Sequence, residues 1–359
     1  MEIVEKKVGG YEAVFVGREP RAGYRGIIAL HSTALGPAVG GTRFWDYASD
    51  EAALEDALRL ARGMTYKNAL AGLPLGGGKS VILGDHRALD REAVMRAHGR
   101  FVEALGGRYV TAEDVGTNPA DMLVIREETR HVAGLPDCSG DPSPVTARGV
   151  FRAAQASAKF RWGSDDLSGR TVALQGCGNV GRHLAKRLGE AGARLFVTDV
   201  DAERVRRVVE ESGARAVEPG EIFEVPADIF APCALGAVVD DATIPRLKVE
   251  IVAGAANNQL REPRHGDELH ARGILYAPDY VANAGGIING CVELLGWTPG
   301  RALAKVDEIY DTLLSIFEQA RAAGVAPHRA ADEVAERRLL AARPAPESFA
   351  PSEATRPVV

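Results

Sequence analysis

The sequence predicts a two-domain α/β protein. Strands alternate with amphipathic helices along the second half of the chain, a pattern typical of a parallel, doubly wound sheet. The chain has 359 residues, enough for two domains, and residues 134–144 (GLPDCSGDPSP) are dense in turn-forming residues. We therefore expect an N-terminal α/β domain with a mixed sheet (1–134, joined by a helix at about 325–342), a Rossmann-type dinucleotide-binding domain (140–324), and a disordered tail (343–359).

The N-terminal elements follow from local patterns. Residues 11–31 alternate apolar and polar and predict two antiparallel strands around a Gly/Pro turn. Ser49 is a suitable N-cap for a helix over residues 50–70, whose alanines and leucines recur on one face. Residues 32–44 (STALGPAVGGTRF) are rich in glycine and predict a loop. The segment KSVILGD predicts a strand.

Composition limits the classes of function. Hydrophobic residues make up 46% and charged residues 26% of the chain, as in ordinary globular proteins. The net charge of −6 argues against nucleic acid or an anionic membrane as the main partner. No apolar run reaches membrane-spanning length, and the N-terminus lacks a signal-peptide core. The four cysteines share no metal or disulfide spacing, so we expect a reduced, cytoplasmic protein.

A dinucleotide site is predicted by the run Gly176-Cys-Gly178-Asn179-Val180-Gly181, which directly follows a strand and opens a helix. In that context the glycines allow a tight turn, and the helix N-terminus can meet a pyrophosphate. Asp199 ends the next strand, where a carboxylate binds the adenosine ribose and repels a 2′-phosphate. The predicted cofactor is therefore NAD rather than NADP.

Lys79 lies in the segment GLPLGGGKS, which resembles a P-loop. A P-loop, however, needs glycine at position 73, where this chain has leucine, and it needs a strand before it and a helix after it. A glycine turn with an exposed lysine is the simplest alternative. Only eight of the 43 basic residues are lysine, so a lysine in an apolar, glycine-rich segment is a candidate for chemistry. Lys67 and Lys79 both meet that description.

Several long blocks resemble the leucine, valine and phenylalanine dehydrogenases of the glutamate dehydrogenase superfamily, in order from about residue 25 to 340. These blocks are GLPLGGGKSVILGD, TAEDVGT, PSPVTARGV, FAPCALGAVV, AGAANNQL and YAPDYVANAGGIIN. The resemblance implies that Lys67 binds the substrate α-carboxylate, that Lys79 is the catalytic base, and that Asp114 moves protons to and from the nitrogen. It further implies reversible, NAD-dependent oxidative deamination in the cleft between the domains, without a metal.

The resemblance also implies the remaining site residues. Those expected near the substrate, besides Lys67, are Val39, Gly40, Gly41, Ala112, Asn258, Ile287 and Gly290. Those expected near the cofactor, besides the glycine motif and Asp199, are Thr146, Ala255, Asn257 and Asn283. The family forms dimers to octamers through its N-terminal domain, so a homo-oligomer is expected.

Side-chain specificity follows from two positions. Glutamate dehydrogenases have GPYKGG, in which a lysine binds the distal carboxylate of the substrate, whereas this chain has GPAVGG with Val39 in that place. A serine that also helps those enzymes bind glutamate is replaced here by Gly290. A distal carboxylate would be buried without a partner there, so an apolar amino acid is expected: leucine, valine or isoleucine. Leucine dehydrogenases have valine where Gly290 stands, which leaves phenylalanine or another aromatic amino acid as the alternative. A non-catalytic NAD-binding regulator would be expected to lack one of Lys67, Lys79 or Asp114.

Overall fold

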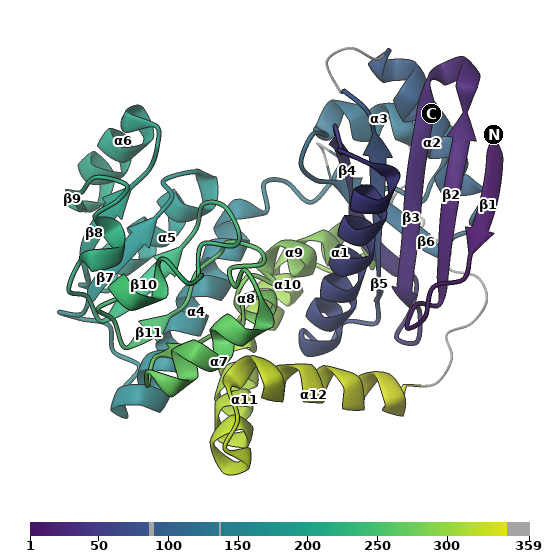
Figure 1. The fold of residues 1–359 in the computed structure, drawn as a ribbon. Helices are drawn as coiled ribbons and strands as arrows, with labels where there is room; N and C mark the ends of the chain where they lie inside the picture. The colour runs from purple at the N-terminus through teal and green to yellow at the C-terminus, as the bar shows by residue number, and fades with distance from the viewer. Residues whose placement is uncertain (86–89, 136–137, 343–359) are drawn as a thin grey trace. The chain divides into compact units, whose positions relative to one another are not determined.

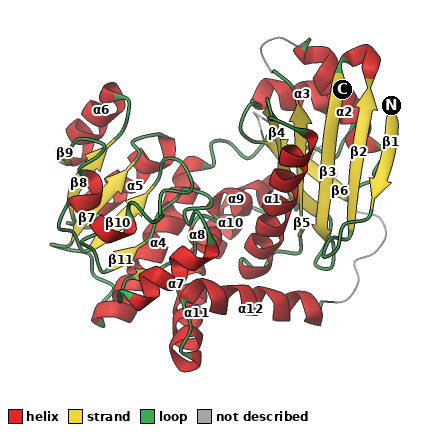
Figure 2. Cartoon of the chain, viewed as in Figure 1, coloured by secondary structure: helices red, strands yellow, loops and turns green. Residues whose placement is uncertain are grey.

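The computed structural model describes residues 1–85, 90–135 and 138–342 (Figure 1). Strands and helices alternate along most of this length, and the expected α/β class is confirmed (Figure 2). Among the described residues, no helix combines the length and the apolar character needed to cross a membrane. The tail predicted for residues 343–359 lies outside the described residues.

The chain forms two compact units. Unit 1 contains the described residues of Met1–Gly140, together with Gly290–Pro299 and residues 335–342. Unit 2 contains Asp141–Asn289 and Gly300–Val334. The domain boundaries expected from the sequence stay a prediction.

Unit 1 is built on a six-stranded mixed sheet with the strand order β1-β2-β3-β5-β4-β6. The pairs β1–β2, β2–β3 and β3–β5 are antiparallel, whereas β4 is parallel to both β5 and β6. The antiparallel pair expected within residues 11–31 is present as β2 and β3. The strands are β1 (Glu2–Lys6), β2 (Ala13–Glu19), β3 (Tyr24–Ser32), β4 (Ala38–Trp45), β5 (Gly76–Leu83) and β6 (Tyr109–Glu113).

Helices cover both faces of this sheet. Helix α1 (Asp50–Leu70) lies across one face, and α2 (Arg91–Glu103) and α3 (Pro119–Glu128) lie on the other (Figure 1). Helix α1 begins where the sequence predicted, because the Ser49 hydroxyl accepts a hydrogen bond from the Ala52 N–H at 3.1 Å. The α1 face is packed with alanines of the helix and with valine and leucine of β5.

The loop expected over residues 32–44 is wrong, because β4 occupies most of it and lies between β5 and β6. Its glycines are present for packing rather than for a turn. A Cβ on Gly40 would lie 1.8 Å from the carbonyl oxygen of Gly78, and one on Gly41 would lie 2.5 Å from that of Glu113. Glycine therefore lets the neighbouring backbones approach closely. Strand β1 and helix α3 were not anticipated.

A buried polar network joins β4, β5 and β6 on the α2 face. The Thr42 hydroxyl bonds to Ser80 at 2.7 Å, to His98 Nε2 at 2.9 Å and to Thr111. The Tyr24 hydroxyl bonds to the other ring nitrogen of His98 at 2.8 Å. Burial lowers the pKa of His98 to about 3, so the ring is neutral and acts within the network as donor and acceptor. These bonds fix the register of the strands.

Unit 2 is built on a six-stranded parallel sheet with the order β12-β11-β10-β7-β8-β9. The chain starts at β7, moves outward to β9, and returns to β10 on the opposite side of β7. This doubly wound order was predicted from the alternation of strands and helices, and in such folds ligands bind in the crevice outside the carboxyl ends of the strands where the order reverses, here β7 and β10. The strands are β7 (Thr171–Gln175), β8 (Arg194–Thr198), β9 (Arg215–Ala216), β10 (Ile229–Pro232), β11 (Ile251–Val252) and β12 (Leu275–Tyr276).

Helices accompany the strands of unit 2. Helix α5 spans Asn179–Glu190 and begins within the glycine motif, where the sequence analysis expected a helix, and α6 spans Ala202–Ser212. Helix α11 (Ile309–Ala323) ends at Gly324, which adopts a left-handed conformation. The other helices are α4 (Ser143–Trp162), α7 (Pro263–Ala271), α8 (Asp279–Ala282) and α10 (Pro299–Asp307), while α9 (Gly285–Leu294) and α12 (Pro327–Ala341) cross the division between the units.

The packing of α1 on β5 gives the first prediction. A Cβ on Gly77 of β5 would lie 2.0 Å from the backbone nitrogen of Thr65 in α1, whereas a Cβ on Gly63 of α1 would meet nothing within 4 Å in the described part of the chain. We expect Gly77→Ala to lower the free energy of unfolding by about 1–3 kcal/mol or more, and Gly63→Ala to raise it by about 0.4–1 kcal/mol. Denaturant unfolding of both variants measures this, and equal effects would show that α1 does not press on β5.

Candidate active site

Lys79 and Asp114 come together on the α1 face of the unit 1 sheet. Lys79 is on β5, and Asp114 directly follows β6. The register of β4 pairs Thr42 with Ser80 on one side and Gly41 with Ala112 on the other, so the side chain of Lys79 lies beside Gly41. A Cβ on Gly41 would in turn lie 2.8 Å from the Cβ of Asp114. The absent side chain at Gly41 therefore leaves the space in which Lys79 meets Asp114.

The two charged groups form a buried ion pair. Lys79 is only 6% exposed, and its Nζ donates a hydrogen bond to Oδ2 of Asp114. Burial lowers the pKa of Lys79, and the Asp114 carboxylate opposes that shift. Burial also disfavours the Asp114 carboxylate, but the neighbouring cations outweigh it and lower its pKa. The arrangement is an ionised carboxylate beside a lysine that releases its proton more readily than a solvated lysine does.

A second cation contacts the same carboxylate oxygen. Arg43, on β4, donates from Nε to Oδ2 of Asp114 at 3.2 Å and from a terminal nitrogen to Oδ2 of Asp56 at 2.7 Å. Asp56 belongs to α1 and also accepts hydrogen bonds from Tyr47 at 2.8 Å and Arg59 at 3.0 Å. The sequence analysis missed Arg43 and Asp56. Arg43 was hidden in the segment taken for a loop, although its position two residues after Gly41 would place it beside Asp114 once β4 is recognised.

Lys67 lies in the last turn of α1 and is partly buried. The same turn is bound to the start of β5. The Asn68 amide donates to the Gly76 carbonyl oxygen at 2.6 Å, and the Thr65 hydroxyl donates to the Gly77 carbonyl oxygen at 3.4 Å. Because Gly77 is two residues before Lys79, the packing brings the segments that carry the two lysines together. The proposed carboxylate contact of Lys67 stays a prediction.

The side chains expected around the substrate are apolar where the sheet carries them. Val39 on β4 is buried and Ala112 on β6 is partly buried, and both lie on the same face as Lys79. Gly40 faces the other way: its carbonyl accepts a hydrogen bond from the Tyr109 hydroxyl at 2.6 Å. Ile287 and Gly290, three residues apart in α9, lie on one face of that helix.

The glycine motif of unit 2 has the geometry of a pyrophosphate cradle. Gly176 adopts φ +102°, and Gly181 packs against it, since a Cβ there would lie 1.9 Å from the Gly176 carbonyl oxygen. Gly178, the N-cap of α5, is different, because a Cβ there would meet nothing within 4 Å of the described structure. No described side chain caps α5. The residues thus fit the pyrophosphate of a dinucleotide, because the N-terminus of α5 carries no side-chain cap among the described residues and the space beside Gly178 is open.

Asp199 directly follows β8, next to this loop. Its Oδ2 accepts a hydrogen bond from the Cys177 N–H at 2.7 Å and its Oδ1 accepts one from the Asp201 N–H at 3.0 Å. The carboxylate is therefore oriented by backbone groups at the carboxyl end of β8. A ribose lying along the crevice would meet an acceptor that is already fixed in place.

The remaining residues expected near the cofactor fall into two contacts within unit 2. The Asn283 amide donates to the Asn257 side-chain oxygen at 2.9 Å and to the Ala255 carbonyl at 3.1 Å. The N-terminal turn of α4 packs on the glycines after Asn283, since a Cβ on Gly286 would lie 3.3 Å from the Thr146 hydroxyl.

Asn258 has an unusual backbone conformation next to these contacts. It adopts φ +51°, and its N–H donates to Oδ2 of Asp279 at 2.6 Å. Asparagine tolerates this left-handed conformation better than most residues do. Such conformations gather at ligand sites, so the geometry supports the expected role of this turn.

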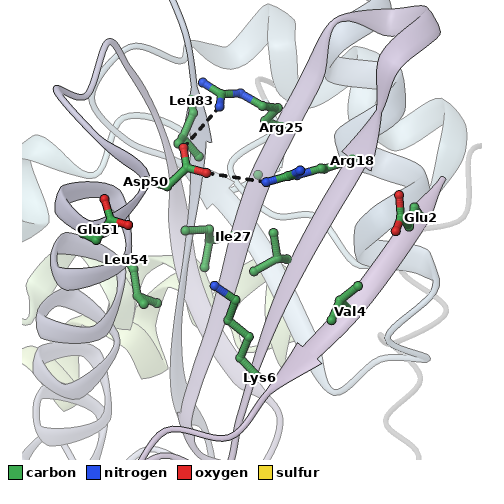
Figure 3. Close-up of a pocket in the computed structure, with 12 residues that line it drawn as sticks. Glu2, Val4, Lys6, Arg18, Arg25, Ile27, Asp50, Glu51, Leu54 and Leu83 are labelled. Atoms are coloured by element: carbon green, nitrogen blue, oxygen red, sulfur yellow. Dashed lines mark hydrogen bonds and ion pairs between the residues drawn. The ribbon is translucent and has the colours of Figure 1, made fainter.

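A separate hollow in unit 1 is not lined by any of the residues expected to bind substrate or cofactor. It has a volume of about 270 Å³ and is lined by charged and aliphatic side chains, among them Lys6, Ile27 and Leu54. In Figure 3, Asp50 lies between Arg18 and Arg25, at 3.6 Å and 3.2 Å. These are exposed ion pairs of the kind that contribute little free energy.

Among the described residues, no three His, Cys, Asp or Glu side chains are grouped to hold a metal ion.

Comparison with known proteins agrees with this geometry. Residues 17–131 match the family model described as "Glu/Leu/Phe/Val dehydrogenase, dimerisation domain", and residues 197–345 match "Glutamate/Leucine/Phenylalanine/Valine dehydrogenase". The chain belongs to the Glu/Leu/Phe/Val dehydrogenase family. It is an NAD-dependent amino acid dehydrogenase, as the sequence analysis predicted.

Individual members of the family are similar over nearly the whole chain. The leucine dehydrogenase of Geobacillus stearothermophilus is 55% identical over 94% of this chain and 93% of its own length. The valine dehydrogenase of Streptomyces coelicolor is 49% identical over 94% of each. The crystal structure of L-tryptophan dehydrogenase from Nostoc punctiforme superposes with a TM-score of 0.82 at 46% identity, covering 92% of this chain and 96% of that one.

The position of Asp199 gives a prediction about the dehydrogenase's cofactor preference. Asp199→Ala is expected to reduce the preference for NAD over NADP by roughly tenfold or more, because a hydrogen bond to a charged group contributes about 1.5–3 kcal/mol. Asp199→Asn should also reduce the preference for NAD over NADP, although the amide oxygen can still accept a hydrogen bond from the Cys177 N–H. The measurement is kcat/KM for both cofactors.

Asp201→Ala is the matched control for this prediction. Its carboxylate caps α6 by accepting from the Glu203 N–H at 3.0 Å. The variant should lose about 1 kcal/mol of stability with the cofactor ratio unchanged. Equal or greater efficiency with NADP in the unmodified enzyme would refute the assignment of Asp199.

Proposed function

We propose that this dehydrogenase reversibly deaminates apolar L-amino acids, with leucine, valine and isoleucine favoured, to the 2-oxo acid and ammonia. The observation that carries the proposal is the buried pair of Lys79 and Asp114 on a sheet face that also presents Val39 and Ala112. The pair supplies proton transfer, and Val39 and Ala112 offer apolar surface to the substrate side chain.

In this proposal each charged group has a separate task. Lys67 binds the substrate α-carboxylate as a cation. Lys79, deprotonated, activates the water that attacks the imino carbon, and Asp114 passes protons to and from the leaving nitrogen. NAD⁺, held by the glycine loop and Asp199, would supply the acceptor for the hydride of the substrate Cα. The balance is L-amino acid, NAD⁺ and water to 2-oxo acid, ammonium, NADH and a proton.

The proposal extends to the residues that hold the two ligands. Asn258, Ile287 and Gly290 complete the substrate contacts. The loop formed by Gly176, Gly178 and Gly181, with Asp199, binds the adenosine half of the cofactor. Thr146, Ala255, Asn257 and Asn283 bind the nicotinamide half. Support comes from the hydrogen bonds that join Asn283 to the 255–257 turn and from the crevice at β7 and β10.

We also propose a cytoplasmic homo-oligomer. The model that matches residues 17–131 is described as a dimerisation domain, which supports self-association through unit 1. The four cysteines share no disulfide spacing in the sequence, which supports a reducing compartment.

The roles of the lysines can be separated by kinetics. Lys79→Ala should lower kcat by roughly 10²-fold or more, as expected for loss of a general base. Lys67→Ala should mainly raise KM for the amino acid, because its contact exists in both ground and transition states. Binding of NADH, followed by fluorescence, should survive both changes.

Lys159→Ala serves as the control, because this exposed lysine of α4 donates only to the local Gly163 carbonyl, at 3.0 Å, among its recorded hydrogen bonds. It should leave kcat and KM unchanged. A Lys79→Ala enzyme with near-normal kcat would return Lys79 to the role of a structural cation.

Gly290 tests the choice between branched-chain and aromatic substrates. Among the described residues, a Cβ at this position would meet only Leu294, at 3.8 Å, which is ordinary contact. Gly290→Val should therefore fold, leave leucine turnover nearly intact and lower the phenylalanine-to-leucine ratio of kcat/KM by roughly 10–200-fold. Gly290→Ala should give an intermediate ratio.

An unchanged or increased ratio in Gly290→Val would show that this residue does not line the side-chain pocket. A higher kcat/KM for phenylalanine or tryptophan than for leucine in the unmodified enzyme would favour the aromatic alternative. That alternative is supported by the structural similarity to an L-tryptophan dehydrogenase.

A further inference from the structure

Arg43 contacts the proposed catalytic pair without being part of it. Its Nε donates to the same oxygen of Asp114 that accepts from Lys79, and its other arm donates to Asp56. The Arg43 side chain is about four-fifths buried, as is that of Asp56. A guanidinium can hold two carboxylates at once because its donors form a rigid fork. Arg43 is thereby fixed by α1 at one end and fixes Asp114 at the other.

We propose that Arg43 is a positioning residue that holds the Asp114 carboxylate against Lys79 and sets the pH at which the pair works. The proposal rests on the proposed function of Lys79 and Asp114. The fixed guanidinium prevents Asp114 from rotating away, and its charge favours the ionised carboxylate. Its charge also disfavours a protonated Lys79, because two cations then share one oxygen.

The surrounding charges alternate in sign. Lys79 is on β5 and pairs with Asp114, which directly follows β6. Arg43 is on β4 and pairs with Asp114 and with Asp56 of α1. Burial has the largest effect on the pKa of Lys79 and lowers it. Of the two outer charges, Arg43 lowers this pKa further by destabilising protonated Lys79, and Asp56 raises it by stabilising protonated Lys79.

Other titratable groups lie around these four. Tyr47, in the loop after β4, and Arg59 of α1 both bond to Asp56. Tyr109 of β6 lies on the opposite face, where burial and then the Asp114 charge raise its pKa above the working range. Lys67 is in the last turn of α1. None of these three side chains, Tyr47, Arg59 and Tyr109, is bonded to Lys79 or Asp114 in the recorded contacts of the described residues.

Charge and geometry can be separated by four variants. Arg43→Met removes both the charge and the fork. Arg43→Lys keeps the charge, but a single ammonium cannot bridge two carboxylates bidentately. Asp56→Asn removes the negative charge on the far side of Arg43 while leaving the contact of Arg43 with Asp114. Tyr47→Phe, the matched control, removes only a hydrogen bond to Asp56.

The measurement is the pH dependence of kcat/KM for leucine, which reports groups of the free enzyme. The leucine ammonium titrates identically in every experiment, so a shift between variants belongs to the enzyme. Because Lys79 acts deprotonated, Arg43→Met should move the acidic limb to higher pH, since protonated Lys79 loses a repelling neighbour. Asp56→Asn should move the limb to lower pH. Arg43→Lys should leave the limb in place but lower the plateau by roughly tenfold or more, since misplaced groups lose rate steeply.

Opposite shifts in Arg43→Met and Asp56→Asn, with Tyr47→Phe unchanged, establish the inference, because a purely structural role would not reverse sign with charge. Shifts in the same direction, or an unmoved limb in Arg43→Met, overturn it. Should Arg43→Met fail to fold, the Asp56→Asn and Arg43→Lys profiles still decide. An active Lys79→Ala enzyme would instead show that the proposed function of the pair is wrong, which keeps the two failures distinct.

Discussion

A lysine buried on the face of a sheet is the interaction on which the rest of unit 1 depends. A buried cation is costly unless a carboxylate pairs with it and hydrogen bonds satisfy the pair. Asp114 supplies that partner, but a single pair would simply fix the proton on Lys79. Arg43 changes the balance by sharing the same oxygen, and Asp56 compensates Arg43 in turn. The alternation keeps each charge paired while leaving the proton on Lys79 less tightly held.

The glycines around this pair and those of unit 2 serve opposite purposes. Gly77 and Gly41 are glycine because neighbouring backbone fills the place of their side chains, which lets α1 approach β5 and the end of β6 approach β4. Gly178 is glycine beside open space, where a ligand can approach the N-terminus of α5. This difference explains in structural terms why GLPLGGGKS is not a P-loop: Gly76, Gly77 and Gly78 lie within the buried strand β5, and no helix directly follows them.

Much of the fold could be predicted from the sequence where a local signal was strong. Helix α1 has its Ser49 cap, and the bounds of α5 and α6 follow from the strand–turn–helix pattern. Strand β4 could not be predicted, because its glycines meet a tertiary demand, close approach to Gly78 and Glu113, that no local pattern encodes. Arg43 was missed for the same reason. Lys79 and Asp114 were named through family resemblance, and only the sheet register explains why residues 35 positions apart meet.

In the proposed function, catalysis and specificity rest on different residues, which bears on how related enzymes serve several substrates. The charged groups lie within β4 and β5, directly after β6 and on α1, whereas the proposed side-chain contacts are Val39, Ala112 and one face of α9. Exchanging an apolar side chain leaves the alternating charges intact, so the chemistry is retained while the pocket changes shape. Related enzymes named for leucine, valine and tryptophan, each about half identical to this chain, are the outcome expected of such a separation.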